Sequence, residues 1–180
     1  MDHKAIAEEA FVGVEGELQT ISQWMYDNPE TGFEEFETSA KLSSFLADHG
    51  FEVEYPAYGL DTAFAARAGN RGPEVVICAE YDALPGVGHA CGHNIIATAA
   101  LGAGIALAGM ADDLGVRVTV LGTPAEEVRG GKVDLINAGA FKGAAASMMI
   151  HPSPDDVLDP GVLAVRHIDV TFHGRDSLHD

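Results

Sequence analysis

A cysteine and a histidine stand close enough in the sequence to bind one metal ion. Only Gly92 separates Cys91 from His93, and its freedom to bend lets both side chains reach the same ion if the chain is extended there. A thiolate and an imidazole are both zinc ligands. Taken alone the pair is a weak signal, because a buried cysteine beside a structural histidine is common.

Further acid–base and metal-binding groups follow later in the chain. Glu126 and Glu127 are adjacent, so one carboxylate could hold a cation while the other acts as a general base on its water. His151 follows the apolar run at residues 148–150, and Asp82 follows the run at residues 75–79. Cys91, the two histidines and a glutamate form a mixed sulfur, nitrogen and oxygen set that suits zinc or a similar divalent ion.

The elements that must position these residues are three short apolar runs, each of which leads into a reactive cluster. We expect strands at residues 75–79, 118–121 and 147–150, with helices at 94–108 and 132–138 between them. Continuous apolar runs alternating with helices indicate a parallel sheet covered on both faces. Because ligands bind outside the carboxyl ends of such strands, the three clusters are expected to converge.

The remaining pattern completes an α/β fold with three layers, α/β/α, and a largely parallel central sheet. Apolar spacing predicts an amphipathic helix at residues 5–27 and a second helix at 37–49. Two strands of a hairpin or meander follow at 51–56 and 62–67. Near the end of the sequence we expect a surface loop at 152–161 and one more strand at 162–172.

Composition fits one globular domain and disfavours two kinds of partner. The chain has 180 residues, of which 47% are hydrophobic, so a real core is expected. Its net charge of −18 would repel nucleic acid and an anionic membrane surface. The apolar part of the one uncharged stretch, residues 95–110, would span only about 24 Å as a helix, which is short of a hydrocarbon core.

Cysteine usage and the N-terminus favour the cytoplasm. Cys78 and Cys91 occupy unrelated positions and build no disulfide framework, which is typical of a reducing compartment. The first residues are polar and include no apolar signal core, so secretion is not indicated.

Four motifs resemble those of the aminoacylase-type metallopeptidases and amidohydrolases. The resemblance covers about residues 21–172 and is closest to the branch of p-aminobenzoyl-glutamate hydrolase, amidohydrolases of N-acyl amino acids and β-alanyl-lysine-type dipeptidases. The motifs are AEYDALPG at 79–86, GHACGHN at 88–94, TPAEE at 123–127 with GGK at 130–132, and MMIHP at 148–152.

The resemblance implies a zinc-peptidase-like catalytic domain and a role for each matching residue. It implies that Glu126 is the general base and that Asp82 orients a ligand or bridges ions. Glu80 stands where many relatives have a ligand histidine, and the Cys-x-His pair is expected to take over coordination. The metal ligands implied by the resemblance are Cys91, His93, Glu127 and His151.

The implied reaction is hydrolysis of an amide bond by metal-activated water. The metal, Zn²⁺ or Mn²⁺ as one ion or two, would polarise the carbonyl. Glu126 would take a proton from the water and pass it to the leaving amine. The substrate would be an N-acyl amino acid, an aminobenzoyl-glutamate-like conjugate or a dipeptide.

One departure from the family pattern lies directly after the paired glutamates. Relatives have a run of glycines there, whereas this chain has Val128 and Arg129 before Gly130. Arg129 is either a solvated loop residue or a ligand for a substrate carboxylate, which a guanidinium fits well.

The resemblance also sets expectations about the end of the sequence. Full-length relatives are much longer and enter a lid domain that supplies a catalytic histidine and commonly pairs subunits into homo-oligomers. We therefore expect residues 1–165 to be the N-terminal part of the catalytic domain, incomplete at its C-terminus, and 166–180 to begin the strand leading toward an absent lid.

Two other interpretations remain open on the sequence alone. A truncated chain could bind metal without catalysing a reaction. Alternatively, Cys91 could be the nucleophile of a thiol hydrolase, with His89 or His93 as its base.

Overall fold

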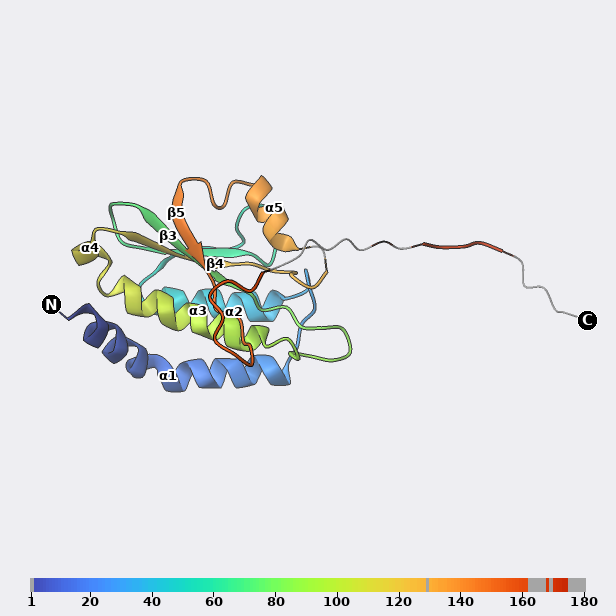
Figure 1. The fold of residues 1–180 in the computed structure, drawn as a ribbon, viewed down its shortest axis with the longest axis horizontal. Helices are drawn as coiled ribbons and strands as arrows, with labels where there is room; N and C mark the ends of the chain where they lie inside the picture. The colour runs from blue at the N-terminus through green and yellow to red at the C-terminus, as the bar shows by residue number, and fades with distance from the viewer. Residues whose placement is uncertain (1, 129, 162–167, 169, 175–180) are drawn as a thin grey trace, which may run out of the picture.

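The computed structural model describes residues 2–128, 130–161, 168 and 170–174. Figure 1 shows their arrangement, in which helices lie on both sides of a central sheet. In chain order the elements are α1 His3–Asp27, α2 Phe36–Asp48, β1 Glu52–Glu54, β2 Phe64–Ala68, β3 Glu74–Ala79, α3 His93–Ala108, α4 Ala111–Leu114, β4 Arg117–Gly122, α5 Gly131–Asn137 and β5 Ala144–Met148.

The five strands form one mixed sheet in the order β1-β2-β4-β3-β5. Strand β3 is parallel to both β4 and β5, as the alternation of strands and helices predicts. Strands β1 and β2 extend this parallel half by antiparallel pairing, β1 with β2 and β2 with β4. The predicted α/β sheet is therefore confirmed in its parallel half, and its other half is an antiparallel extension.

Each face of the sheet has its own hydrophobic core. Helices α1, α2 and α3 cover one face, where Leu101 of α3 packs in the cluster that contains Ile77 and Val120. Helix α5 lies on the other face, where Leu135 joins the cluster that contains Val76. Neighbours along a strand point to opposite faces, so β3 supplies both cores and the three-layer arrangement is confirmed.

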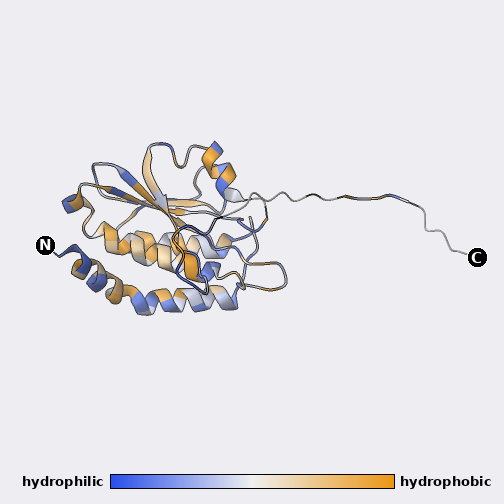
Figure 2. Cartoon of the chain, viewed as in Figure 1, coloured by the Kyte–Doolittle hydropathy of each residue, from blue (hydrophilic) through white to orange (hydrophobic). Residues whose placement is uncertain are grey.

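Helix α3 is the apolar centre of its layer. Figure 2 shows it coloured hydrophobic along its length, whereas hydrophilic colours recur along α1, which lies outside it. Small residues let α3 lie close against the sheet, because a Cβ on Gly104 would be only 2.3 Å from Cγ2 of Val120. The close packing fixes the N-terminus of α3, which begins at His93.

Several boundaries differ from the sequence-based expectation. Strand β5 ends at Met148, so His151 lies three residues beyond the strand rather than directly at its end. The short helix α4 was not predicted. The predicted strand at 162–172 lies largely outside the described residues, and its described members, 168 and 170–172, have no regular secondary structure. The predicted domain boundary at residue 165 falls in the same region.

None of the described helices is both long enough and apolar enough to cross a membrane.

Candidate metal centre

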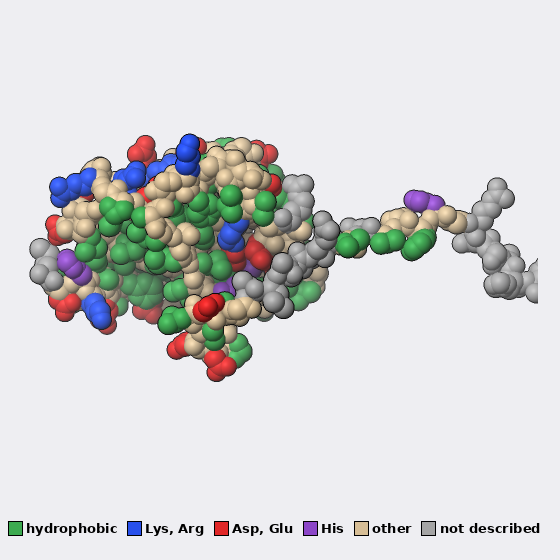
Figure 3. Space-filling view, turned by 45° about the horizontal axis from the view of Figure 1, so that its top comes forward, with side chains coloured by type: hydrophobic (Ala, Val, Ile, Leu, Met, Phe, Trp, Pro, Cys, Tyr) green, Lys and Arg blue, Asp and Glu red, His purple; other side chains and the backbone are tan. Residues whose placement is uncertain are grey.

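The predicted site residues meet at the carboxyl ends of the parallel strands. Glu80 and Asp82 follow β3, the paired glutamates follow β4, and His93 begins α3. On this side of the molecule acidic, basic and histidine side chains gather together (Figure 3). The convergence is that expected for a sheet whose neighbouring strands run parallel.

His93 is held by a carboxylate through one ring nitrogen. Its side chain is completely buried, and Nδ1 lies 3.0 Å from Oδ1 of Asp82, which is buried as well. Because a carboxylate only accepts hydrogen bonds, Nδ1 carries the proton and donates it. This leaves the lone pair of His93 on Nε2.

The other ring nitrogen of His93 faces acidic oxygens. Nε2 lies 3.5 Å from Glu80 Oε2, 3.9 Å from Glu126 Oε2 and 3.8 Å from Glu127 Oε1. Among the described residues this buried nitrogen has no hydrogen-bond partner. A lone pair surrounded by carboxylate oxygens requires a proton or a cation between them.

The pKa of His93 reflects this surrounding. Burial alone would lower it, but the hydrogen bond to Asp82 and the charges of Asp82, Glu80 and Glu126 raise the pKa above its ordinary value. The same negative charges that favour a proton on the ring also favour a metal ion at Nε2.

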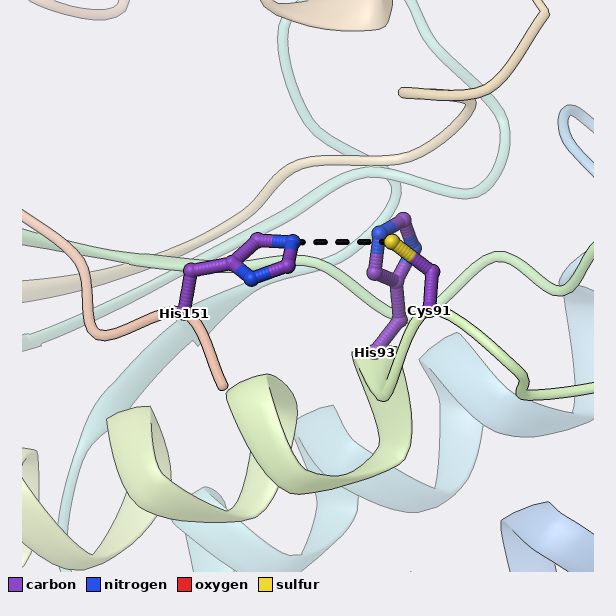
Figure 4. Close-up of side chains that lie close together, drawn as sticks. All are labelled: Cys91, His93 and His151. Carbon is purple, nitrogen blue, oxygen red and sulfur yellow. Dashed lines mark hydrogen bonds between the residues drawn. The ribbon is translucent and has the colours of Figure 1, made fainter. Parts of the chain in front are cut away.

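Cys91 and His151 lie beside His93 and point toward the same space (Figure 4). Sγ of Cys91 is 3.5 Å from Nε2 of His151, and the two imidazole rings are 6.2 Å apart and nearly perpendicular. Nδ1 of His151 is 2.8 Å from the carbonyl oxygen of Pro152, which leaves Nε2 available as a ligand atom.

The approach of His151 depends on the glycine between Cys91 and His93. Gly92 adopts a left-handed conformation with φ of 84°, which favours glycine. A Cβ there would lie 3.0 Å from Cγ of Pro152. Gly92 therefore provides both the bend and the space that bring His151 to the pair.

Two overlapping groups of side chains could each hold an ion. The possible ligand atoms of Cys91, His93 and His151 lie within 4.8 Å of one another, and so do those of Glu80, His93 and Glu126. Both groups include His93, whose buried Nε2 lacks a partner among the described residues. The donor set of sulfur, nitrogen and oxygen atoms fits a divalent cation such as zinc.

The thiol of Cys91 is poorly suited to act as a nucleophile by itself. Burial and the neighbouring Glu127 carboxylate raise its pKa to about 11, so the thiolate is disfavoured unless a cation is present. Its hydrogen-bonded imidazole is that of His151, whereas His93 is bonded to Asp82. These contacts argue against the thiol-hydrolase interpretation, in which His89 or His93 is the base.

The loop after β4 carries the paired glutamates and is tied to Asp82. The backbone N–H of Glu127 donates to Oδ2 of Asp82 at 2.9 Å, so one carboxylate orients both His93 and this loop. Glu126 is partly exposed, and burial together with the charges of Glu80 and Glu127 raises its pKa. A raised pKa suits a general base that must also release its proton.

One contact of the site involves a residue for which the sequence suggested no role. Lys132, in the first turn of α5, forms an ion pair with the buried carboxylate of Glu80. Lys132 belongs to the GGK motif, but nothing in the sequence indicated which of the 28 acidic residues it would contact. The ammonium of Lys132 balances the negative charge of Glu80.

The structure thus brings six of the predicted residues together. These are Asp82, Cys91, His93, Glu126, Glu127 and His151. Arg129, predicted as a substrate ligand, lies outside the described residues.

Comparisons with known proteins find relatives that match most of this chain. The chain is 41% identical over 179 residues to the Xaa-Arg dipeptidase of Mus musculus, covering 89% of this chain and 40% of that protein. It is 34% identical over 151 residues to a p-aminobenzoyl-glutamate hydrolase of Escherichia coli, covering 73% of this chain and 31% of that one. The chain therefore spans about two fifths or less of these relatives.

Solved structures share the fold. The YXEP protein of Bacillus subtilis, a dinuclear metal-binding peptidase of the M20 family, superposes with a TM-score of 0.71 at 27% identity. The superposition covers 86% of this chain and 45% of that protein. Residues 76–176 match the profile of Peptidase family M20/M25/M40, and they include every predicted metal ligand. Because the match extends over more than half of the sequence, the chain belongs to this peptidase family.

Proposed function

We propose that this protein is a metal-dependent hydrolase of amide or peptide bonds. The observation that carries the proposal is the buried Nε2 of His93, which faces three carboxylates and has no hydrogen-bond partner among the described residues. Cys91 and His151 contribute a sulfur and a nitrogen atom next to it. The hydrolases among the relatives support the same reaction class.

Four side chains would hold the metal in this proposal, namely Cys91, His93, Glu127 and His151. When bound, a Zn²⁺ or Mn²⁺ ion would supply Lewis acidity toward the amide carbonyl of the substrate. The dinuclear relative YXEP favours two ions over one.

Glu126 would be the proton carrier. Its carboxylate lies in the same cluster, is accessible from solvent and has a raised pKa, so it can take a proton from an attacking water and give it to the leaving amine. Asp82 would act by orientation, since its two oxygens fix the ring of His93 and the backbone of Glu127.

The substrate would be an N-acyl amino acid, an aminobenzoyl-glutamate-like conjugate or a dipeptide. Among these we favour dipeptides with a basic C-terminal residue. The relative with the highest identity given above is an Xaa-Arg dipeptidase.

The proposal also covers the compartment and the assembly of the protein. Neither Cys78 nor Cys91 is in a disulfide, which supports the cytoplasm as the compartment. The pairing of subunits through a lid, and residues 1–165 as part of the catalytic domain, remain proposals based on the resemblance.

The test is hydrolysis by the purified, metal-loaded protein of three probes: an Xaa-Arg dipeptide, p-aminobenzoyl-glutamate and N-acetylcysteine. We expect turnover of at least the first, loss of turnover after chelation, and its return with Zn²⁺ or Mn²⁺. Glu126→Gln should lower kcat by roughly 10²–10⁴-fold while metal content is kept. Glu17→Gln, an exposed change on α1, is the matched control.

Two outcomes would contradict this proposal. Stoichiometric metal binding without hydrolysis of any probe would favour the non-catalytic metal-binding interpretation instead. Full activity of Glu126→Gln would remove the assigned proton carrier.

A further inference from the structure

Glu35 is a completely buried carboxylate that the proposed reaction does not use. It occupies the N-cap position of α2, but its side chain makes no capping hydrogen bond to that helix. Glu30 does that instead, since its oxygens accept the N–H groups of Glu37 at 3.1 Å and Thr38 at 2.7 Å. The carboxylate of Glu35 is therefore free to bind elsewhere.

Both oxygens of Glu35 bind groups far away in the sequence. Oε1 accepts the backbone N–H of Ala125 at 2.8 Å, and Oε2 accepts the hydroxyl of Thr62 at 2.9 Å. The carbonyl of Thr62 in turn accepts the hydroxyl of Tyr81 at 2.6 Å. The four residues that carry these groups are all buried, which makes each hydrogen bond costly to lose.

Ala125, whose N–H donates to Glu35, is the residue directly before the paired glutamates. Ala125 has a φ of +57°, a left-handed conformation that a residue with a Cβ rarely adopts. Such a conformation persists when its surroundings determine it. Gly32 packs so closely that a Cβ on it would lie 2.9 Å from Cα of Ala125, so the segment before α2 supports the same turn.

A second carboxylate holds the other side of the turn. Asp82 accepts the N–H of Glu127, two residues after the N–H that Glu35 accepts. Glu126 thus lies between two backbone positions that buried carboxylates fix. Fixing both positions sets the direction in which the side chains of Glu126 and Glu127 leave the turn.

We propose that Glu35 is a positioning residue that, through the N–H of Ala125, holds Glu126 and Glu127 toward His93. The inference rests on the proposed function only for what those two glutamates do. What Glu35 supplies is an acceptor of the right length, because a shorter side chain would not reach the N–H of Ala125.

The pKa of Glu35 reflects both its burial and its hydrogen bonds. Burial raises its pKa to about 7, even though its hydrogen bonds with Ala125 and Thr62 act in the opposite direction. Burying an acid costs folding free energy, and the hydrogen bonds with Ala125 and Thr62 offset part of that cost.

Three substitutions of Glu35 and one control distinguish the effect of side-chain length from the effects of charge and of helix stability. Glu35→Gln keeps the length, since its amide oxygen can accept from Ala125 and its NH₂ can donate to the hydroxyl of Thr62. Glu35→Asp keeps the charge but is one methylene shorter, and Glu35→Leu removes the acceptor. The control Leu42→Ala destabilises the same helix from a fully buried position without touching the turn.

The first measurement is Zn²⁺ affinity by competition with a chromophoric chelator. We expect Glu35→Asp and Glu35→Leu to weaken Zn²⁺ binding about 10–100-fold, the range typical for groups that orient metal ligands. Glu35→Gln and Leu42→Ala should stay within about threefold of the unmodified protein. Equal affinity of all four variants, or equal losses in Leu42→Ala and Glu35→Asp, would overturn the proposal.

The second measurement needs neither metal nor turnover. Amide hydrogen exchange of Ala125 in the metal-free protein should be slow in the unmodified chain and in Glu35→Gln, and about tenfold faster or more in Glu35→Asp. Fast exchange of Ala125 in the unmodified, folded protein would overturn the proposal even if Glu35→Leu does not fold. Because no substrate is involved, a failure here is distinct from a failure to hydrolyse amides.

Discussion

The two nitrogens of His93 have different neighbours, and this difference decides what the ring can bind. Nδ1 donates to Asp82, so the lone pair is on Nε2, where the acidic side chains and Cys91 converge. A carboxylate that fixes the tautomer of a histidine in this way is common behind metal ligands. Asp82 accepts a hydrogen bond on each of its two oxygens, one from His93 and one from the backbone of Glu127.

Asp82→Asn is expected to reverse the tautomer. If the asparagine oxygen still accepts from the N–H of Glu127, its NH₂ must face Nδ1 of His93, which then becomes the acceptor and leaves the proton on Nε2. Zn²⁺ affinity should fall about 10–100-fold. The exposed substitution Asp61→Asn should leave it unchanged, and an unaltered affinity of Asp82→Asn would contradict the assigned tautomer.

Glu35 gives the stability of the protein a specific pH dependence. Its pKa is about 7 in the folded chain against an ordinary value of 4.5, so between these pH values the folded state keeps a proton that the unfolded state releases. Stability from this group is therefore highest below pH 4.5, falls as pH rises, and stays lower above pH 7. The full change is about 3 kcal/mol at most.

Denaturant unfolding of the unmodified protein and Glu35→Gln at several pH values checks this dependence. The free energy of unfolding of the unmodified protein, relative to that of Glu35→Gln, should decrease between pH 4.5 and 7 and then level off. The comparison cancels other titrating groups, such as Asp82, whose lowered pKa has the opposite effect. Parallel pH profiles of the two proteins would contradict the raised pKa of Glu35.

At the scale of elements, α3 is placed by its small residues. Gly104 lies against Val120 of β4, and Gly102 lies against Phe11 and Leu18 of α1. Because His93 begins this helix, a shift of α3 away from the sheet would also move the site. The glycines of α3 thus link packing to the geometry of the metal centre.

Gly104→Ala tests the close packing of α3. Its Cβ would lie 2.3 Å from Cγ2 of Val120, so we expect a loss of about 1–3 kcal/mol in the free energy of unfolding. Gly13→Ala in α1 is the matched control, because no atom lies within 4 Å of the added Cβ. That change should stabilise the protein by up to about 1 kcal/mol. Equal effects of both substitutions would contradict this packing.

The sequence predicted elements where the local pattern decides and missed contacts that depend on distant residues. The helix expected at 94–108 is α3, within one residue at its start, because its apolar run and Gly109 mark both ends. The strand expected at 147–150 is β5, which begins three residues earlier and ends two residues earlier, since its alanines carry a weaker strand signal than Met148 and Met149. The antiparallel pairing of β2 with β4 depends on contacts about 55 residues apart.

The candidate site divides in the same way. Cys91, His93 and the paired glutamates were predicted because they stand in short local motifs, and the resemblance of those motifs to a known family implied their roles. The pairing of Lys132 with Glu80 and the reach of Glu35 to Ala125 were missed. Both depend on the folded path of the chain across 52 and 90 residues, and neither has a local pattern.

For the whole molecule, metal binding and folding are one equilibrium. Three of the proposed ligands, Cys91, His93 and His151, come from segments 60 residues apart that meet only in the folded state. A metal that binds only this state stabilises it by about 2.7 kcal/mol at a free concentration 100 times its Kd. The metal should therefore protect the entire domain against unfolding.

Thermal unfolding with and without Zn²⁺ checks this linkage. We expect Tm to rise with Zn²⁺ concentration, and to return to the metal-free value after chelation. Cys91→Ser should lose most of the increase, whereas Cys78→Ser, at the buried cysteine on β3, should keep it relative to its own metal-free Tm. A Tm that does not respond to Zn²⁺ would contradict the ligand set.

The carboxylates around His93 also determine how quickly an ion arrives. The described part of the site contains the carboxylates of Glu80, Asp82, Glu126 and Glu127 and the ammonium of Lys132, which pairs with Glu80. The net charge of the whole chain is −18. Such a field draws divalent cations toward the site during diffusion, so their association rate should fall steeply as ionic strength rises. The same field opposes the carboxylate of an incoming substrate until a metal has bound, so the electrostatics favour binding of the metal before the substrate.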